Sequence, residues 1–300
     1  MSLSKFSDSS SASADSSSAG VFSSYEATVK SLSLEDLPGI ASKIRRHIVT
    51  MLGKAGSGHP GGSLSAVEIV SALYFKVLRH RPEAPRWEGR DRFILSKGHA
   101  APVLYAVLAE CGYFPVKELM TLRQLGSRLQ GHADRTATPG VEMSSGSLGQ
   151  GLSFSIGVAL AGRLNRQHYR TYVLLGDGEC DEGQVWEAAM AAAHFKLDNL
   201  VAIVDNNGQQ IDGWNCDVMN LEPLNQKWAA FGWHVFEVDG HDFSQLLAAF
   251  NEAKRIKGQP SVIIAHTIKG KGVSFMENQA AFHGKALSAE EVEQALKELA

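Results

Sequence analysis

The 300-residue sequence has few cysteines, no long hydrophobic run and no excess of charge of either sign. Its three cysteines, Cys111, Cys180 and Cys216, are odd in number and form no C-x-x-C pair, so neither a disulfide framework nor a zinc knuckle is supported. No apolar stretch approaches the roughly 20 residues that a membrane-spanning helix needs. Lys and Arg total 29 against 32 Asp and Glu, a net charge of −3, which gives no electrostatic case for a nucleic acid or a membrane as partner.

The first 24 residues differ in composition from the rest of the chain. Twelve of them are Ser and few are large and apolar, so the segment cannot bury enough surface to offset the entropy of ordering. We expect a disordered Ser-rich tail over residues 1–24. The segment is not typical of a targeting peptide, because it contains Asp8 and Asp15 and has neither Arg nor an apolar core. Residues 25–300 are patterned without a break, which predicts one domain.

Short apolar runs alternate with helical patterns along this domain. Five runs predict buried strands, at 93–96, 171–175, 200–204, 234–238 and 261–266. Helical spacing predicts helices at 34–52, after Gly61 and Gly62, at 102–111, 148–165, 184–197, 225–231 and 243–257, and from Ser288. Such alternation is typical of an α/β fold with a mostly parallel sheet and helices on both faces.

Two glycine-rich segments are candidates for binding a phosphate group. Residues 56–61 match G-x-G-x-x-G formally, but a helix rather than a strand precedes them. Gly176-Asp177-Gly178 is the stronger candidate, because an apolar strand leads into it and a helix follows. In a parallel sheet this places Asp177 at the carboxyl end of a strand, where open α/β sheets bind ligands. For this motif alone, an ordinary turn with a solvated Asp is the alternative.

The next strand along the chain ends in similar chemistry. Residues 200–204 run into Asp205-Asn206-Asn207-Gly208, so two strands end in carboxylate and amide oxygens. Mg²⁺ prefers about six oxygen ligands and usually keeps some of them for phosphates and water. The Asp177 carboxylate, the Asn207 side-chain oxygen and the Gln209 carbonyl would supply three. The pattern indicates a metal-bridged diphosphate.

Histidines are the second signal. Of the 11, four that lie beside glycine in loop-like segments are the candidates: His59, His99, His132 and His283. One such histidine is more often a turn residue, but four suit chemistry on a polyol or carbonyl compound, because imidazole both donates and accepts near neutral pH. His80 and His168 have the surroundings of surface residues. Residues 144–151 open a helix of small residues, and its free backbone N–H groups would meet a ligand. Close helix packing through glycine is the alternative, and the two are compatible.

Taken in order along the chain, these motifs resemble the transketolase family. Gly176-Asp177-Gly178 followed by Asn207 is similar to the family's thiamine diphosphate motif. Further matching segments lie at 57–62, 95–99, 146–151, 211–213 and 282–285, in the family's order. The resemblance covers residues 35–300 and implies the thiamine diphosphate-binding fold, with its diphosphate-binding domain at residues 25–300.

The resemblance also implies a role for individual residues. Asp177, Asn207 and the Gln209 carbonyl would hold Mg²⁺, with Ca²⁺ or Mn²⁺ as substitutes. The residues expected to contact thiamine diphosphate are His99, Gly146, Leu148, Gly178, Glu179, Asn207 and His283. His59 and His283 would face the substrate hydroxyl and carbonyl and transfer protons. His132 would stabilise charge on a substrate oxygen or bind a terminal hydroxyl, and His99 completes the catalytic set. Glu182 matches a family glutamate at the contact between two active sites.

Ordinary members of the family are much longer than this chain. The resemblance therefore implies the N-terminal subunit of a split transketolase, paired with a separate C-terminal chain in an α2β2 assembly and acting on sugar phosphates in the cytoplasm. It implies transfer of a two-carbon ketol unit from a ketose phosphate to an aldose phosphate. The glutamate that contacts the cofactor's pyrimidine ring and the arginines that bind the sugar phosphate belong to the other half. We therefore expect the isolated chain to be inactive.

Two other functions stay open at this point. The chain would also suit another thiamine-dependent enzyme with split subunits, similar to deoxyxylulose phosphate synthase or to a 2-oxoacid dehydrogenase. The many histidines favour ketoses over 2-oxoacids, and consumption of pyruvate would separate the two. A non-catalytic partner that binds the cofactor without turnover is the third reading, although no decay of the site is visible in the sequence.

Overall fold

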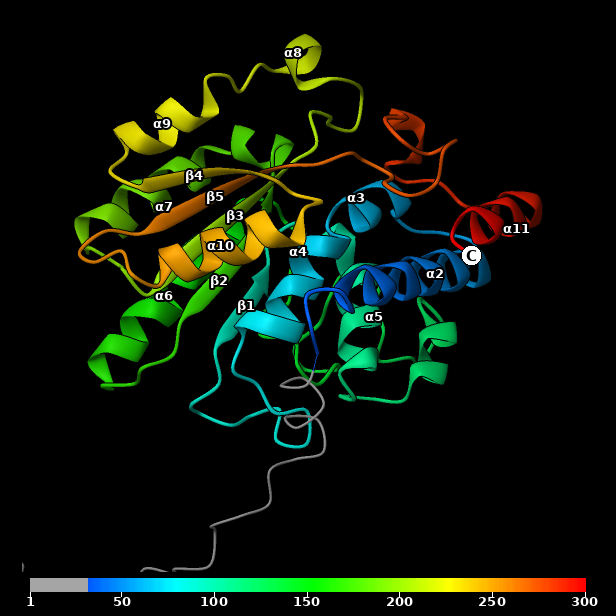
Figure 1. Ribbon diagram of the computed structural model, residues 1–300, viewed down its shortest axis with the longest axis horizontal. Helices are drawn as coiled ribbons and strands as arrows, with labels where there is room; N and C mark the ends of the chain where they lie inside the picture. The colour runs from blue at the N-terminus through cyan, green and yellow to red at the C-terminus, as the bar shows by residue number, and fades with distance from the viewer. Residues whose placement is uncertain (1–31) are drawn as a thin grey trace, which may run out of the picture.

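The computed structural model describes residues 32–300 (Figure 1). The predicted Ser-rich tail, residues 1–24, lies outside the described residues. The strands are β1 (Arg92–Leu95), β2 (Thr171–Gly176), β3 (Leu200–Asn206), β4 (His234–Asp239) and β5 (Ser261–His266). The α-helices are α2 (Leu37–Ala55), α3 (Pro60–Ser65), α4 (Val67–Ala72), α5 (Ala101–Glu110), α6 (Gln150–Leu164), α7 (Gly183–His194), α8 (Asn215–Val218), α9 (Leu224–Ala230), α10 (Phe243–Ala253) and α11 (Ala289–Glu298).

The five predicted strands form one sheet in the order β1-β2-β3-β5-β4. Every neighbouring pair is parallel. Because parallel strands end at the same edge, the segments that follow β2, β3 and β5 are brought to one side of the sheet. The predicted parallel α/β fold is confirmed, and this edge is where the candidate site lies.

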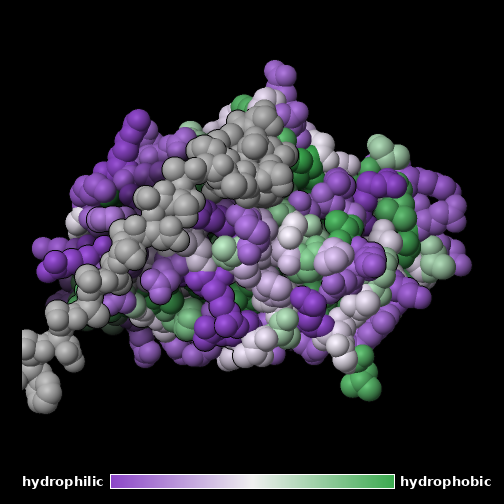
Figure 2. Space-filling model, turned by 90° about the horizontal axis from the view of Figure 1, so that it is seen from below, coloured by the Kyte–Doolittle hydropathy of each residue, from purple (hydrophilic) through white to green (hydrophobic). Residues whose placement is uncertain are grey.

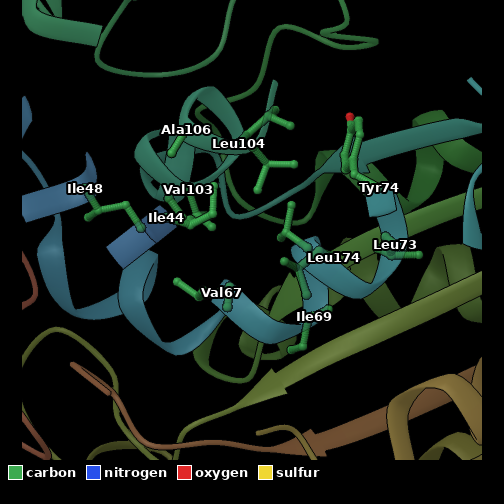
Figure 3. Packing of buried hydrophobic residues seen from close by; sticks show 14 of the residues in the cluster. Ile44, Ile48, Val67, Ile69, Leu73, Tyr74, Val103, Leu104, Ala106 and Leu174 are labelled. Carbon is green, nitrogen blue, oxygen red and sulfur yellow. The ribbon is translucent and has the colours of Figure 1, made fainter. Parts of the chain in front are cut away.

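Helices cover both faces of the sheet. Successive side chains of a strand point to opposite faces, so apolar residues on both faces need a covering layer. Tyr172 and Leu174 of β2 join a core with α2, α4, α5 and α10. Val173 and Leu175, which point the other way, join a second core with α6, α7 and α9. Figure 3 shows the first core, where Ile44 of α2 lies beside Val103 of α5. Burial on both faces explains why β1, β2, β3 and β5 read as continuous apolar runs rather than as alternating patterns. The prediction that 234–238 is buried is wrong: β4 lies at the edge of the sheet, and only Val238 in it is buried.

Some element boundaries differ from the prediction for local reasons. α2 begins at Leu37, with a proline in its first turn, and ends before Gly56, whose φ of 62° closes the helix in the left-handed conformation. The helix expected after Gly61 and Gly62 is divided into α3, α4 and a π-helical turn at Leu73–Val77. Short 3-10 helices, which the pattern did not predict, occur at Gly98–Ala100, Val116–Thr121, Gly178–Asp181 and Ala280–Phe282.

The face of the molecule shown in Figure 2 is largely polar. Hydrophilic side chains predominate on the face shown in Figure 2, outside its grey atoms, and hydrophobic ones are scattered. Within residues 32–300 no helix is both long enough and apolar enough to cross a bilayer. His168 is exposed as expected. The prediction for His80 is wrong: it is buried, and its ring bonds to the Tyr74 carbonyl at 2.8 Å and the Tyr113 hydroxyl at 3.0 Å.

Candidate active site

The loops that follow β2 and β3 meet at the carboxyl edge of the sheet. Gly176, the last residue of β2, pairs with Asp205 of β3. The Asp177 carboxylate accepts hydrogen bonds from the backbone amides of Gly178 at 2.9 Å and Gly208 at 2.6 Å. Asn207, directly before Gly208, is also buried. The two loop tips are thus in direct contact, as a ligand held by both would require.

A cavity of about 330 Å³ opens at this contact. Every residue that the sequence analysis assigned to catalysis, cofactor or metal lines it: His59, His99, His132, Gly146, Leu148, Asp177, Gly178, Glu179, Asn207, Gln209 and His283. Lys97, Ile211 and Lys269, to which no role had been assigned, line it as well. Glu182 is not among the lining residues and is exposed at the start of α7.

The four candidate catalytic histidines form one cluster, although they come from four distant segments. The ring centroid of His59 lies 5.3 Å from that of His99, 6.1 Å from His132 and 5.5 Å from His283. His99 and His283 are 5.0 Å apart. Burial lowers the pKa of His99 and of His132, with Lys97 adding to the effect at His99 and Arg123 at His132. The cluster therefore favours neutral imidazoles.

Asp177 is a buried carboxylate with unusual electrostatics. Besides the two amides, its Oδ2 accepts from the Asn215 side-chain amide at 2.9 Å. Burial, together with the neighbouring Asp205 carboxylate, raises the pKa of Asp177 to about 6. A cation in the cavity would offset both causes and keep the carboxylate charged.

Glu179 organises the backbone around the cavity. Its carboxylate accepts from the amides of Gly149 at 2.8 Å and Gly176 at 2.9 Å, and from the Ser96 hydroxyl. The Ser96 hydroxyl in turn accepts from the Gly151 amide at 3.1 Å. The amides of Gly149 and Gly151 are therefore already used within the protein, so close packing explains these two glycines, while Gly146 and Leu148 remain on the cavity wall.

Lys97 and Asp205 form an ion pair beneath the cavity that sequence reasoning missed. Both side chains are almost fully buried, and their charged atoms are in direct contact. Asp205 also accepts from the hydroxyls of Ser65, at 2.6 Å, and Thr267. This bonding lowers the pKa of Asp205 against the opposing effect of burial. Paired and bonded in this way, the two charges are tolerated in the interior.

Lys269 is the second residue missed. It follows β5, so the same strand-end rule that identified Asp177 would have found it. Its ammonium lies 3.2 Å from Nδ1 of His283 and 3.3 Å from the Gln210 carbonyl. Burial, with Lys97 nearby, lowers the pKa of Lys269 to about 8.

The loop that carries Lys269 is fixed at both ends by a buried cluster of charged and polar side chains. Arg45 donates two hydrogen bonds to Glu68, at 2.6 and 2.8 Å, and a third to the Lys271 carbonyl at 2.9 Å. His241 contacts Glu68 through Nδ1 at 2.9 Å and accepts from the Ile268 amide through Nε2 at 2.9 Å. Backbone bonds on both sides of Lys269 thus set its direction.

The donor set fits a metal-bridged anion better than an all-protein metal cage. Among residues 32–300, no group of three His, Cys, Asp or Glu side chains converges as a metal site. Two buried amide oxygens nevertheless have no hydrogen-bond partner: Oε1 of Gln209, which lines the cavity, and Oδ1 of Asn215, whose side-chain nitrogen bonds to Asp177. A buried carboxylate and an unsatisfied amide oxygen on the lining of one cavity suit a hard cation whose remaining ligands come from phosphate and water.

Comparisons with known proteins agree with this geometry. The family model for the transketolase thiamine diphosphate binding domain matches residues 38–300. A 6-deoxy-6-sulfo-D-fructose transketolase subunit from Clostridium sp. (strain MSTE9) is 48% identical over 264 residues, covering 88% of this chain and 96% of that protein. An apulose-4-phosphate transketolase subunit of Phocaeicola vulgatus is 42% identical over 268 residues, covering 89% and 95%. Human transketolase is 43% identical, but the match covers only 42% of its length.

Solved structures give the same result. A Pichia stipitis transketolase in complex with sedoheptulose-7-phosphate superposes with a TM-score of 0.83 at 35% identity, covering 88% of this chain and 40% of that one. Transketolase of Campylobacter jejuni gives 0.84 at 33% identity, covering 89% and 43%. The chain thus spans less than half the length of these transketolases. It belongs to the transketolase family, and it has that family's thiamine diphosphate-binding domain.

Proposed function

We propose that this chain is the N-terminal subunit of a heteromeric transketolase, which transfers a two-carbon ketol unit from a ketose phosphate to an aldose phosphate with thiamine diphosphate and Mg²⁺. The observation that carries this proposal is the single cavity at which the Asp177 and Asn207 loops and the four histidines converge. An acidic and amide-rich floor suits the metal-bound diphosphate, and the histidines suit a substrate rich in hydroxyl groups.

The floor of the cavity would hold the cofactor. Asp177, the Asn207 side chain and the Gln209 carbonyl would hold Mg²⁺, or Ca²⁺ or Mn²⁺ in its place. The proposed cofactor contacts are His99, Gly146, Leu148, Gly178, Glu179, Asn207 and His283. When bound, thiamine diphosphate supplies the group that stabilises a carbanion, and the protein supplies binding, orientation and electrostatics.

The chain's own residues would act on the substrate. His59 and His283 would contact the substrate hydroxyl and carbonyl and serve its proton transfers, and His132 would stabilise charge on a substrate oxygen. Because these three histidines lie together beside the cofactor site, they would hold the substrate there, which lowers the entropic part of the activation barrier. Partial burial of His59, His99 and His283 limits the access of water.

A separate C-terminal chain would complete the enzyme. The coverage values support this: the Clostridium and Phocaeicola relatives, which this chain covers to 96% and 95%, are named as subunits, whereas it covers 42% of human transketolase. We propose an α2β2 assembly in the cytoplasm, with Glu182 at the contact between active sites and with no nucleic acid or membrane as partner. Since the subunit relatives are named for a sulfonated and a phosphorylated sugar, an anionic ketose is the proposed substrate class.

Co-purification with the native partner chain tests the proposal. The pair should convert a ketose phosphate and an aldose phosphate only when thiamine diphosphate and a divalent cation are present, and the isolated chain should not. His283→Ala should reduce turnover strongly, whereas His168→Ala, at an exposed position away from the cavity, should not. Turnover by the isolated chain would contradict the subunit proposal, and consumption of pyruvate in place of the ketose would favour a 2-oxoacid enzyme.

A further inference from the structure

Two of the cavity histidines have a cation at the same ring nitrogen. The Arg123 guanidinium lies 3.5 Å from Nδ1 of His59. The Lys269 ammonium lies 3.2 Å from Nδ1 of His283. The two contacts come from unrelated loops, one before the His132 segment and one after β5. Each nevertheless presents a donor to the equivalent atom of its histidine.

A donor at Nδ1 decides where the imidazole carries its proton. A guanidinium and a protonated amine have N–H donors and no acceptor, so the nitrogen that they face must accept. A neutral histidine with an accepting Nδ1 carries its only proton on Nε2. His59 and His283 are therefore in the same tautomer, each with one N–H donor remaining.

Three histidines outside the cavity have a carboxylate partner in place of a cation. His47 and Glu110 are 2.7 Å apart, His241 and Glu68 2.9 Å, and His266 and Glu237 3.1 Å. A cation beside an imidazole disfavours the charged imidazolium. In the part of the chain that the structure describes, no carboxylate forms an ion pair with a histidine of the cavity cluster. The histidines that pair with a carboxylate thus lie outside the cavity, and the two that contact a cation line it.

The surroundings of both rings act in the same direction. His59 is faced by Arg123, Lys269 and the His132 ring, and burial followed by Arg123 lowers the pKa of His59 to about 4. His283 is faced by Lys269, Lys97 and the His59 ring, and burial followed by Lys269 lowers its pKa to about 4 as well. The ring of His99 adjoins both.

Each cation is held in place by its own loop. Arg123 has a φ of 61°, a left-handed conformation that is uncommon for a residue with a side chain. Its guanidinium covers Gly131, where a Cβ atom would lie 3.0 Å from Arg123 Cζ. Lys269 is held by the bonds of His241 and Arg45 to its loop.

We propose that Arg123 and Lys269 are positioning residues that fix His59 and His283 as neutral imidazoles, each with its proton on Nε2. Their use in catalysis rests on the function proposed above, whereas the tautomer itself does not. In this state neither ring accepts a proton through Nε2. In this state both act as hydrogen-bond donors that stabilise negative charge developing on a substrate oxygen. In the proton transfers proposed above, either ring would accept a proton only after its Nδ1 contact breaks.

Proton–nitrogen correlation spectra of the isotopically labelled chain test this without cofactor, partner or turnover. Near pH 7, His59 and His283 should each show a proton on Nε2 and none on Nδ1. In Arg123→Met the His59 ring, and in Lys269→Met the His283 ring, should titrate at a higher pH and populate the Nδ1–H form. Lys269→Arg should restore the original state of His283.

Matched controls are provided by neighbouring cations that point elsewhere. Arg128 pairs with Glu118 at 3.0 Å and Lys271 faces Glu277 at 3.6 Å, so Arg128→Met and Lys271→Met should leave both histidines unchanged. A proton on Nδ1 of either ring in the unaltered chain would overturn the proposal, as would unchanged spectra in Arg123→Met and Lys269→Met. Failure of the proposed function alone would leave the tautomers as stated.

Discussion

The Asp177 carboxylate accepts a hydrogen bond from the Gly208 amide at 2.6 Å, which joins the loop after β2 to the loop after β3. The relationship follows from the sheet: two adjacent parallel strands end at the same edge, and each is followed by polar residues. The buried carboxylate and the neighbouring amide oxygens make this junction the proposed metal site.

Asp177→Ala is expected to abolish binding of thiamine diphosphate with Mg²⁺, by more than about 100-fold, because both a ligand and the neutralising charge are lost. Calorimetry on the complex with the partner chain measures this. Asp217→Asn, an exposed position on α8, serves as the control and should bind normally. Unchanged affinity in Asp177→Ala would rule out the metal assignment.

Glu179→Ala is expected to lower the free energy of unfolding by about 3 kcal/mol or more, since the Ser96, Gly149 and Gly176 donors lose their acceptor in the interior. Urea denaturation gives the value. Glu179→Gln, which keeps an acceptor, should lose less, and Glu187→Ala, exposed on α7, should change little. Equal stability of Glu179→Ala and Glu187→Ala would show that the three bonds are unimportant.

Gly270→Ala is expected to destabilise the protein by at least about 2 kcal/mol. Gly270 has a φ of 80°, and a Cβ atom there would lie 2.4 Å from the Met276 carbonyl oxygen. Gly39, in the first turn of α2, has open space around the same position, so Gly39→Ala should stabilise by up to about 1 kcal/mol. Thermal denaturation of the two variants compares them directly, and the reverse order of stability would contradict the described loop.

Acid is expected to destabilise the protein through the cavity histidines. The pKa values of His59 and His283 are about 4 in the folded chain, below the ordinary value of 6.5. Between these values the unfolded chain binds more protons, so stability falls as the pH falls from about 6.5 to about 4. The melting temperature of the double variant His59→Asn/His283→Asn should depend less on pH in this window than that of the exposed-site control His168→Asn. Parallel curves would exclude the effect.

His241→Phe is expected to loosen the loop that carries Lys269, because the Ile268 amide loses its acceptor. Hydrogen exchange of residues 267–272 should become at least about 10-fold faster, with little change elsewhere. His47→Phe removes a comparable histidine–glutamate contact outside the cavity and should leave this segment protected. His241→Gln, which keeps an acceptor, should show an intermediate rate. Identical exchange in His241→Phe and the unaltered chain would contradict the assigned role.

The sequence permitted prediction of what depends on local patterns. Strand ends and the parallel sheet placed Asp177 near Asn207, and the glycine context singled out His59 and His283. Arg123 and Lys269 were not predicted, because the directions of their side chains depend on contacts between distant segments. The Arg123 guanidinium packs against Gly131, and the loop of Lys269 is held by hydrogen bonds from His241 and Arg45. The Lys97–Asp205 pair was missed for the same reason, since the two residues lie on different strand ends. Patterns locate strand ends, but tertiary contacts decide which neighbouring charges face each other.

Anomalous diffraction from crystals of the complex grown with thiamine diphosphate and Mn²⁺ tests the central claim most directly. The account predicts one Mn²⁺ peak bounded by the Asp177 carboxylate, the Asn207 side-chain oxygen and the Gln209 carbonyl, with diphosphate oxygens as its further ligands. A diphosphate bound away from these two loops, or bound there without a metal ion, would contradict it.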